Sequence, residues 1–172
     1  MPDPRPHLGE PLALDLLNTR WNGAGGPRDL LADVDGLAIW LGTAGLTERV
    51  AADAPTLAAL RRARDAVHDT VTTGGRDALN SVLAHGRIRR SLTAAGPVAE
   101  PDIGDPAELP GWLAAADLLD LLDRAADRIR QCAHPDCVLF FYDTSRNGTR
   151  RWHSMAACGN RTKAARHYAR RS

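Results

Sequence analysis

Four residues in the last quarter of this 172-residue sequence are suited to holding a metal ion. They form two pairs, Cys132 with Cys137 and His153 with Cys158. Four residues separate the members of each pair, and fifteen separate the pairs. Zinc binds cysteine sulfur and histidine nitrogen at tetrahedral corners, and a pair on a tight turn supplies two corners. Because protein would fill all four positions, we expect a structural Zn²⁺ rather than a catalytic one.

His134 is an alternative fourth ligand, since it lies between the first two cysteines. It precedes Pro135 in a tight turn, where its ring is expected to point outward, so we favour His153. The cluster contains every cysteine of the chain. An odd number of cysteines argues for metal binding or a reactive thiol rather than a disulfide framework. The competing interpretation is three buried, inert cysteines.

A basic segment follows the first cysteine pair. From Asp143 to Ser172 the chain has eight basic residues and one acid, although its overall net charge is only +1. Such asymmetry predicts contact with a polyanion, and arginines on a helix can neutralise phosphates and read guanine in a major groove. The alternative is a solvated terminal helix with Asn160 as its N-cap. The candidate DNA contacts are Arg146, Arg150, Arg151, Asn160, Arg161, Lys163, Arg166, Arg170 and Arg171.

A second polar group follows an apolar run near the start of the chain. It consists of Asp15, Asn18, Thr19, Arg20 and Trp21, which could line an effector pocket or could simply tie down the first helix. No other part of residues 1–126 resembles a nucleophile–base pair or a phosphate-binding glycine loop. We therefore expect no enzymatic activity.

The metal ligands need a small module around them. Residues 138–142 read as a strand, 145–148 as a turn containing Asn-Gly, and 149–152 as the returning strand. A helix would begin near Cys158. A knuckle, a hairpin and a helix together make a treble-clef-like zinc finger over residues 127–172. A module of this size has too little core to fold without a metal.

The preceding residues, 1–126, are expected to form a mainly helical domain with a minor β-hairpin. Helical periodicity, caps and glycine stops predict helices over 33–45, 55–72, 77–85 and 112–124. Residues 12–19 could be a short strand or a buried helix, 22–27 a loop, and 87–100 a hairpin. A linker over 100–111 precedes the last helix. The predicted fold class is therefore mainly α with an appended zinc finger.

The residues Cys158-Gly-Asn-Arg161 and the stretch from Asp143 to Met155 resemble the CGNR zinc finger. Residues 12–19 are similar to the opening of the helical ABATE domain that accompanies it. The resemblance implies a stress-related transcription regulator that binds DNA. The third zinc ligand is commonly cysteine in this family, so the resemblance implies a Cys₃His variant here.

Hydrophobic residues make up 44% of the chain and charged residues 25%, as in globular proteins. No run approaches the roughly 20 apolar residues of a membrane span, and the start lacks a secretory pattern. We therefore expect a cytoplasmic, zinc-containing DNA-binding regulator, with a homodimer and a small-molecule effector as further expectations. The alternative is a zinc-stabilised module that binds protein or RNA without sequence-specific DNA binding.

Overall fold

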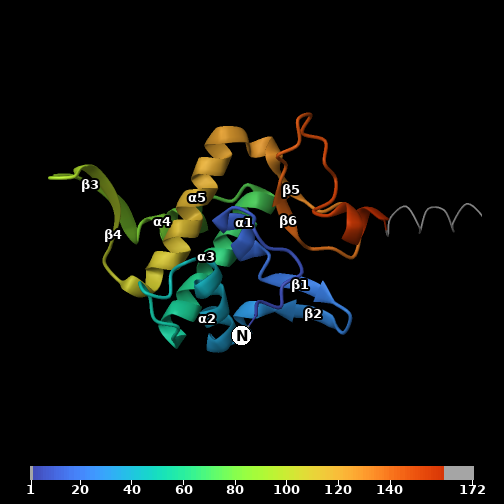
Figure 1. Cartoon of the computed structure of the whole chain (residues 1–172), viewed down its shortest axis with the longest axis horizontal. Helices are drawn as coiled ribbons and strands as arrows, with labels where there is room; N and C mark the ends of the chain where they lie inside the picture. Colours follow the sequence, from blue (N-terminus) through green and yellow to red (C-terminus); the bar gives the residue numbers. More distant parts are fainter. Residues whose placement is uncertain (1, 161–172) are drawn as a thin grey trace, which may run out of the picture.

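The computed structural model describes residues 2–160, in which helices alternate with three two-stranded antiparallel sheets (Figure 1). Helical residues make up 47% and strand residues 19% of this range, so the fold is mixed α/β and the predicted mainly α class is wrong. The helices are α1 (Leu12–Leu17), α2 (Val34–Thr43), α3 (Ala54–Thr73), α4 (Asp77–Leu83) and α5 (Leu109–Ala125). The paired strands are β1 (Arg20–Gly23) with β2 (Gly26–Asp29), β3 (Gly86–Thr93) with β4 (Gly96–Ile103), and β5 (Ile129–Gln131) with β6 (Phe140–Tyr142).

The four helices predicted from periodicity and caps are present. The side chain of Asp33 accepts a hydrogen bond from the Gly36 amide at 2.9 Å and begins α2. Asp53 caps α3 in the same way through the Thr56 amide. Gly74 ends α3 with a φ of +79°, which glycine adopts without steric cost. Local capping chemistry therefore fixes the boundaries of the longest helix.

The core is built where α1, α3 and α5 meet. Every residue of α1 after Leu12 is buried, which explains why its sequence shows no amphipathic pattern. Helix α5 approaches α3 closely at Gly111, where a Cβ atom would lie only 2.7 Å from the Cβ of Ala63. Trp40 and Leu60 are fully buried in the same cluster.

The β1–β2 hairpin accounts for part of the error in fold class, since residues 22–27 were expected to be a loop. Trp21 pairs with Arg28, and Gly23 pairs with Gly26 across the turn. These strands have only four residues each and contain glycine and proline, so neither gives a strand signal in the sequence. Tertiary packing favours them instead, because Trp21 packs against the hydrophobic core.

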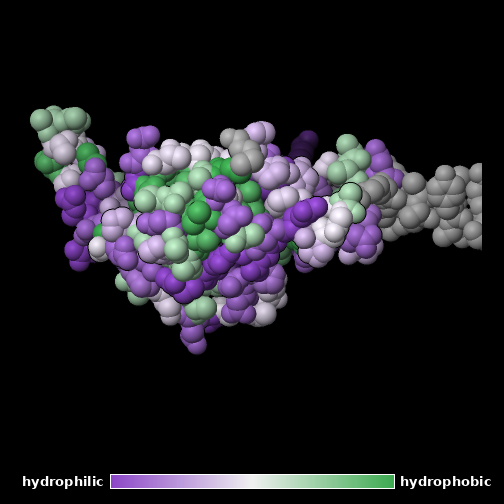
Figure 2. All heavy atoms as spheres, turned by 90° about the horizontal axis from the view of Figure 1, so that it is seen from below, coloured by the Kyte–Doolittle hydropathy of each residue, from purple (hydrophilic) through white to green (hydrophobic). Residues whose placement is uncertain are grey.

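The predicted hairpin over 87–100 is confirmed, but it is longer than expected and runs from Gly86 to Ile103. The expected linker therefore begins inside β4. This hairpin stands away from the body of the molecule, and its outer end carries apolar side chains (Figure 1, Figure 2). Ile88 is 52% exposed and Leu92 is 83% exposed.

The C-terminal hairpin differs from the prediction in its pairing. Strand β6 pairs with the upstream strand β5, not with residues 149–152. The first cysteine pair therefore lies in the loop that joins β5 to β6. Residues 149–152 touch this loop through a hydrogen bond from the Ala133 amide to the Arg151 carbonyl at 2.8 Å.

The C-terminal module shares its core with the preceding helices. Phe140 on β6 is 4% exposed and belongs to the main hydrophobic cluster. Asn18, which follows α1, donates its amide to the Phe140 carbonyl at 2.9 Å and accepts from the Phe140 amide at 2.8 Å. The two parts of the chain are therefore joined by a buried pair of hydrogen bonds between the Asn18 side chain and the Phe140 backbone. Within residues 2–160, no helix combines the length and apolar character that a membrane span requires.

Candidate metal centre

Cys132, Cys137, His153 and Cys158 converge on one point of the C-terminal module, where their ligand atoms all lie within 4.8 Å of one another. The first two lie in the β5–β6 loop, and Cys158 lies in a short helical turn, Met155–Gly159. Cys132, His153 and Cys158 are buried, and Cys137 is half-buried. The predicted ligand set is therefore assembled in space.

The distances and chemistry of this cluster fit Zn²⁺. Sulfur and nitrogen ligands at about 2.3 and 2.0 Å from a tetrahedral ion are about 3.5 Å apart. The Cys137 Sγ and His153 Nδ1 atoms are 3.5 Å apart. Burial and the neighbouring Cys132 and Cys158 raise the pKa of Cys137 to about 12. A divalent cation reverses this tendency by binding the thiolates, so the cluster is a structural zinc site.

Local hydrogen bonds hold the two ligand turns. The Cys132 amide donates to the Leu139 carbonyl at 2.9 Å, which closes the first turn. Ser154 starts the second turn, since its Oγ accepts from the Ala157 amide and its carbonyl accepts from the Cys158 amide. His134 lies outside the cluster, and its Nδ1 accepts from the Asp136 amide at 3.2 Å. The choice of His153 over His134 therefore agrees with the geometry.

Two family models match the chain. The CGNR zinc finger matches residues 128–171. The ABATE domain, described as "Putative stress-induced transcription regulator", matches residues 10–123, which is more than half of the chain. This chain belongs to the ABATE family. Its zinc module belongs to the CGNR type. Among curated proteins, none matches the sequence significantly.

The N-terminal segment around His7 and Glu10 contacts the zinc site. The sequence did not reveal this contact. The His7 ring packs against the His153 ring with centroids 4.9 Å apart. Glu10 accepts from His7 Nε2 at 2.8 Å and from the Tyr142 amide at 2.8 Å. The Pro-rich start carries no periodic signal for these contacts. A polar His-x-x-Glu pair beside the first apolar run was the only hint in the sequence.

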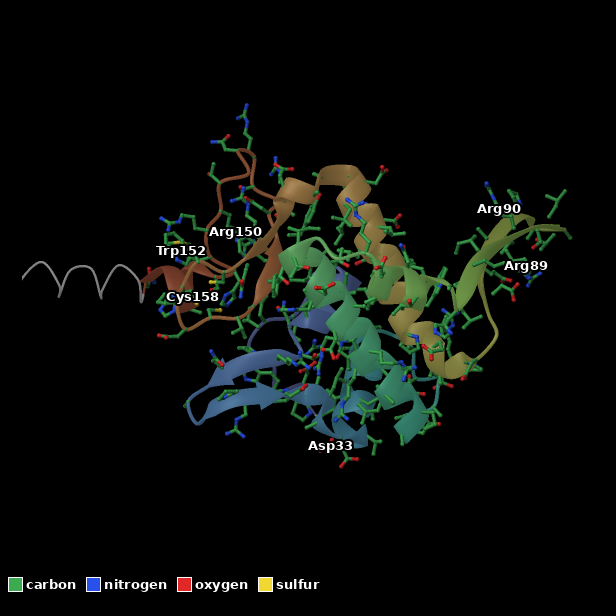
Figure 3. All side chains as sticks on the ribbon, turned by 180° about the vertical axis from the view of Figure 1, so that it is seen from behind. Asp33, Arg89, Arg90, Arg150, Trp152 and Cys158 are labelled. Carbon is green, nitrogen blue, oxygen red and sulfur yellow. The ribbon has the colours of Figure 1, made fainter. Side chains whose placement is uncertain are left out.

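The predicted DNA contacts divide into three groups. Arg146, Arg151 and Asn160 are exposed on the CGNR module. Arg150 is turned inward, where it donates to the Trp152 and His153 carbonyls and lies over the Phe141 ring at 4.7 Å. Arg150 therefore holds the backbone that carries a zinc ligand, close to Cys158 (Figure 3). The remaining candidates lie outside the described residues: Arg161, Lys163, Arg166, Arg170 and Arg171.

Asp143 organises the loop before that ligand. Its side chain accepts from the Ser145 and Arg150 amides, both at 2.9 Å. Burial alone would raise the pKa of Asp143, but these hydrogen bonds and the charge of Arg128 outweigh it and lower the pKa. The loop is therefore held by an ionised, fully buried carboxylate.

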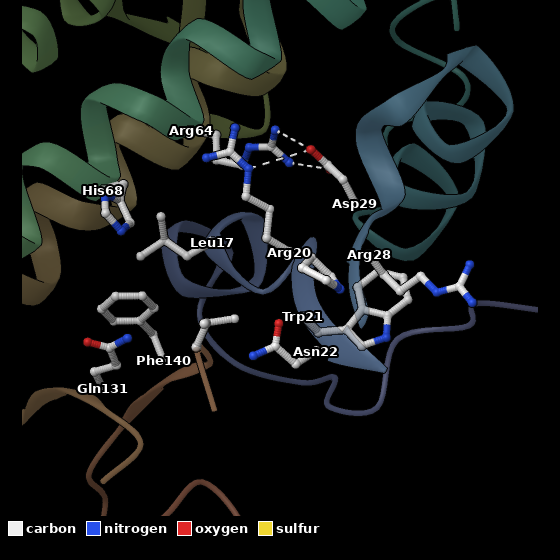
Figure 4. A pocket seen from close by; sticks show the side chains of 12 residues that line it. Leu17, Arg20, Trp21, Asn22, Arg28, Asp29, Arg64, His68, Gln131 and Phe140 are labelled. Atoms are coloured by element: carbon white, nitrogen blue, oxygen red, sulfur yellow. Dashed lines mark hydrogen bonds and ion pairs between the residues drawn. The ribbon is translucent and has the colours of Figure 1, made fainter. Parts of the chain in front are cut away.

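The five residues proposed to bind an effector fall into two groups. Asp15 pairs with the buried Arg5 at 2.8 Å, Asn18 joins the two parts of the chain, and Thr19 donates to the Leu16 carbonyl. These three residues tie down α1. Arg20 and Trp21 instead line a cavity of about 510 Å³ between the ABATE domain and the zinc module (Figure 4).

Proposed function

We propose that this zinc-containing regulator binds DNA through the basic surface of its CGNR module. The observation that carries the proposal is the zinc site itself, because it organises the module on which Arg146, Arg151 and Asn160 are each exposed, just before the basic C-terminal sequence. That sequence adds five basic residues after Asn160 against no acid. An excess of arginine and lysine favours phosphate contacts.

The proposed role of the metal is structural. Three thiols and one imidazole supply a complete tetrahedral set, which leaves no coordination position for a reacting water. The module contributes positioning of basic side chains rather than chemistry. We accordingly propose a binding protein and not an enzyme.

The decisive measurement is affinity for a duplex from the upstream region of its own gene against a scrambled duplex, over a salt series. For contacts with B-form DNA, the logarithm of affinity should fall with the logarithm of salt concentration, by a slope of about 0.9 per phosphate contacted. Tight binding that depends on sequence supports a DNA-binding regulator. Absence of binding even at low salt would contradict the proposal and point to a protein or RNA partner.

A matched pair of variants localises the surface. The double change Lys163→Ala with Arg166→Ala should weaken binding and reduce the salt slope by about 2, since two phosphate contacts are lost. Arg89→Ala with Arg90→Ala removes two positive charges at the opposite end of the molecule (Figure 3) and should leave the slope unchanged. Equal effects from both pairs would mean that binding follows total charge and not the C-terminal surface.

A further inference from the structure

The cavity beside the zinc module has walls from three separate segments (Figure 4). Trp21 and Arg28 come from the β1–β2 hairpin, Arg64 and His68 from α3, and Phe140 from β6. Its volume of about 510 Å³ lies in the range of small-molecule sites. Residues of both the ABATE domain and the CGNR module therefore line the cavity.

The lining joins an apolar body to a basic end. Leu17, Val138 and Phe140 supply aliphatic and aromatic surface. The charged lining residues are three arginines against one aspartate. Asp65 pairs with Arg20 at 3.1 Å and Asp29 pairs with Arg64 at 2.6 Å, so three arginines against two aspartates leave an excess of one positive charge. A cavity with this lining favours a flat apolar molecule that carries a negative charge.

Arg64 lies at the basic end of the cavity. Its side chain is 2% exposed, and its two terminal nitrogens donate to Asp29 and to Thr19 Oγ1. Its Nε is buried and has no hydrogen-bond partner among the residues that the structure describes. Buried donors are nearly always paired in folded proteins. Arg64 lines the cavity, so a bound molecule whose oxygen reached Nε would supply the missing acceptor.

We propose that this cavity binds a small aromatic carboxylate, with its ring between Trp21 and Phe140 and its carboxylate at the arginine-lined end. The inference rests on the proposed function in one respect, because it takes the bound molecule to be an effector of the regulator. Binding of the ligand requires no DNA, so its test is independent of the DNA-binding test.

The test is isothermal titration calorimetry of the zinc-loaded full chain with 1-naphthoate, and with 1-naphthalenemethanol as the uncharged comparison. We expect 1-naphthoate to bind saturably with a Kd below about 1 mM. The alcohol should bind with a Kd at least about tenfold higher. Equal affinity for the two compounds would overturn the basic-end assignment. Absence of saturable 1-naphthoate binding would overturn the site.

Two matched variants place the bound molecule. Val138→Trp fills the cavity from its edge, where Val138 is 39% exposed, and should weaken 1-naphthoate binding at least about tenfold. Val34→Trp makes the same change at a residue that is 40% exposed and lies outside the cavity lining, and should leave binding unchanged. If Val138→Trp binds 1-naphthoate as tightly as the unaltered protein, the ligand does not bind in this cavity. Both changes are made at partly exposed sites, so neither depends on removing the buried Arg64.

DNA affinity of the same proteins separates the two proposals. If 1-naphthoate binds and DNA does not, the cavity assignment stands and the DNA-binding proposal fails. If DNA binds and 1-naphthoate does not, the reverse holds.

Discussion

At the scale of single residues, Asn18 contributes more to stability than its place in a polar run suggests. Both halves of its amide pair with the Phe140 backbone. Asn18→Ala leaves a buried N–H and a buried C=O unpaired, at a cost of about 1–3 kcal/mol for each group. We therefore expect the free energy of unfolding to fall by about 2–6 kcal/mol, measured by urea denaturation.

The matched control is Asn22→Ala. Asn22 is exposed and donates one hydrogen bond, to the Asp136 carbonyl at 2.9 Å. Its loss should cost about 1 kcal/mol or less. Similar losses for the two variants would show that the buried pair of hydrogen bonds at Asn18 contributes no more than one exposed hydrogen bond.

The ion pair between Asp29 and Arg64 should give a measurable pH dependence. Burial alone would raise the pKa of Asp29, but hydrogen bonds and charge from Arg64 outweigh it, so its pKa in the folded chain is lowered. The stability that this pair contributes is fully present above the ordinary aspartate pKa of about 3.9 and is lost as pH falls through the lowered value. Asp29→Asn should cost about 3 kcal/mol at neutral pH.

Unfolding of both proteins from pH 7 to pH 3 checks this prediction. The difference between wild type and Asp29→Asn should shrink below about pH 4, because acid protonates Asp29 and removes the charge that the variant lacks. Protonation of the zinc ligands affects both proteins and cancels in the difference. A difference that stays constant over this range would contradict the assignment.

At the scale of elements, the zinc module and the helices should respond differently to loss of a ligand. Cys158→Ser should abolish stoichiometric zinc and expose residues 127–160 to rapid hydrogen exchange. The helices α3 and α5 should remain folded but less protected, because Phe140 belongs to their core. Ala156→Ser introduces the same side chain at an exposed position of the same turn and should retain zinc. Unchanged metal content in the Cys158 variant would refute the ligand assignment.

How well an element could be predicted followed the range of the contacts that stabilise it. The caps of α2 and α3 and the spacing of the four zinc ligands are local, and the sequence displays them. The β1–β2 hairpin and the packing of His7 on His153 depend on contacts between distant residues, for which no periodic pattern exists. Helical periodicity predicts α3 but cannot identify Asp29, on a distant hairpin, as the ion-pair partner of Arg64.

At the scale of the whole molecule, the cavity and the proposed DNA surface should be coupled. The cavity joins the β1–β2 hairpin to β6, and Asn22 connects that hairpin to the knuckle that carries Cys132 and Cys137. A molecule in the cavity would restrict movement of the zinc module, so DNA binding would have less conformational entropy left to lose. Positive coupling of about fivefold or more is therefore expected between 1-naphthoate and DNA.

Linkage makes this prediction strict, because 1-naphthoate must raise DNA affinity by the same factor by which DNA raises 1-naphthoate affinity. Each factor is measured by titrating one ligand in the absence of the other ligand and again at a saturating concentration of it. Hydrogen exchange of residues 127–160 should slow when 1-naphthoate alone is bound, which would identify restricted movement as the origin. Asn22→Ala should retain DNA binding and reduce the factor toward one, since it removes the link from the hairpin to the knuckle. A factor of one in the unaltered protein would mean that the zinc module does not respond to the cavity.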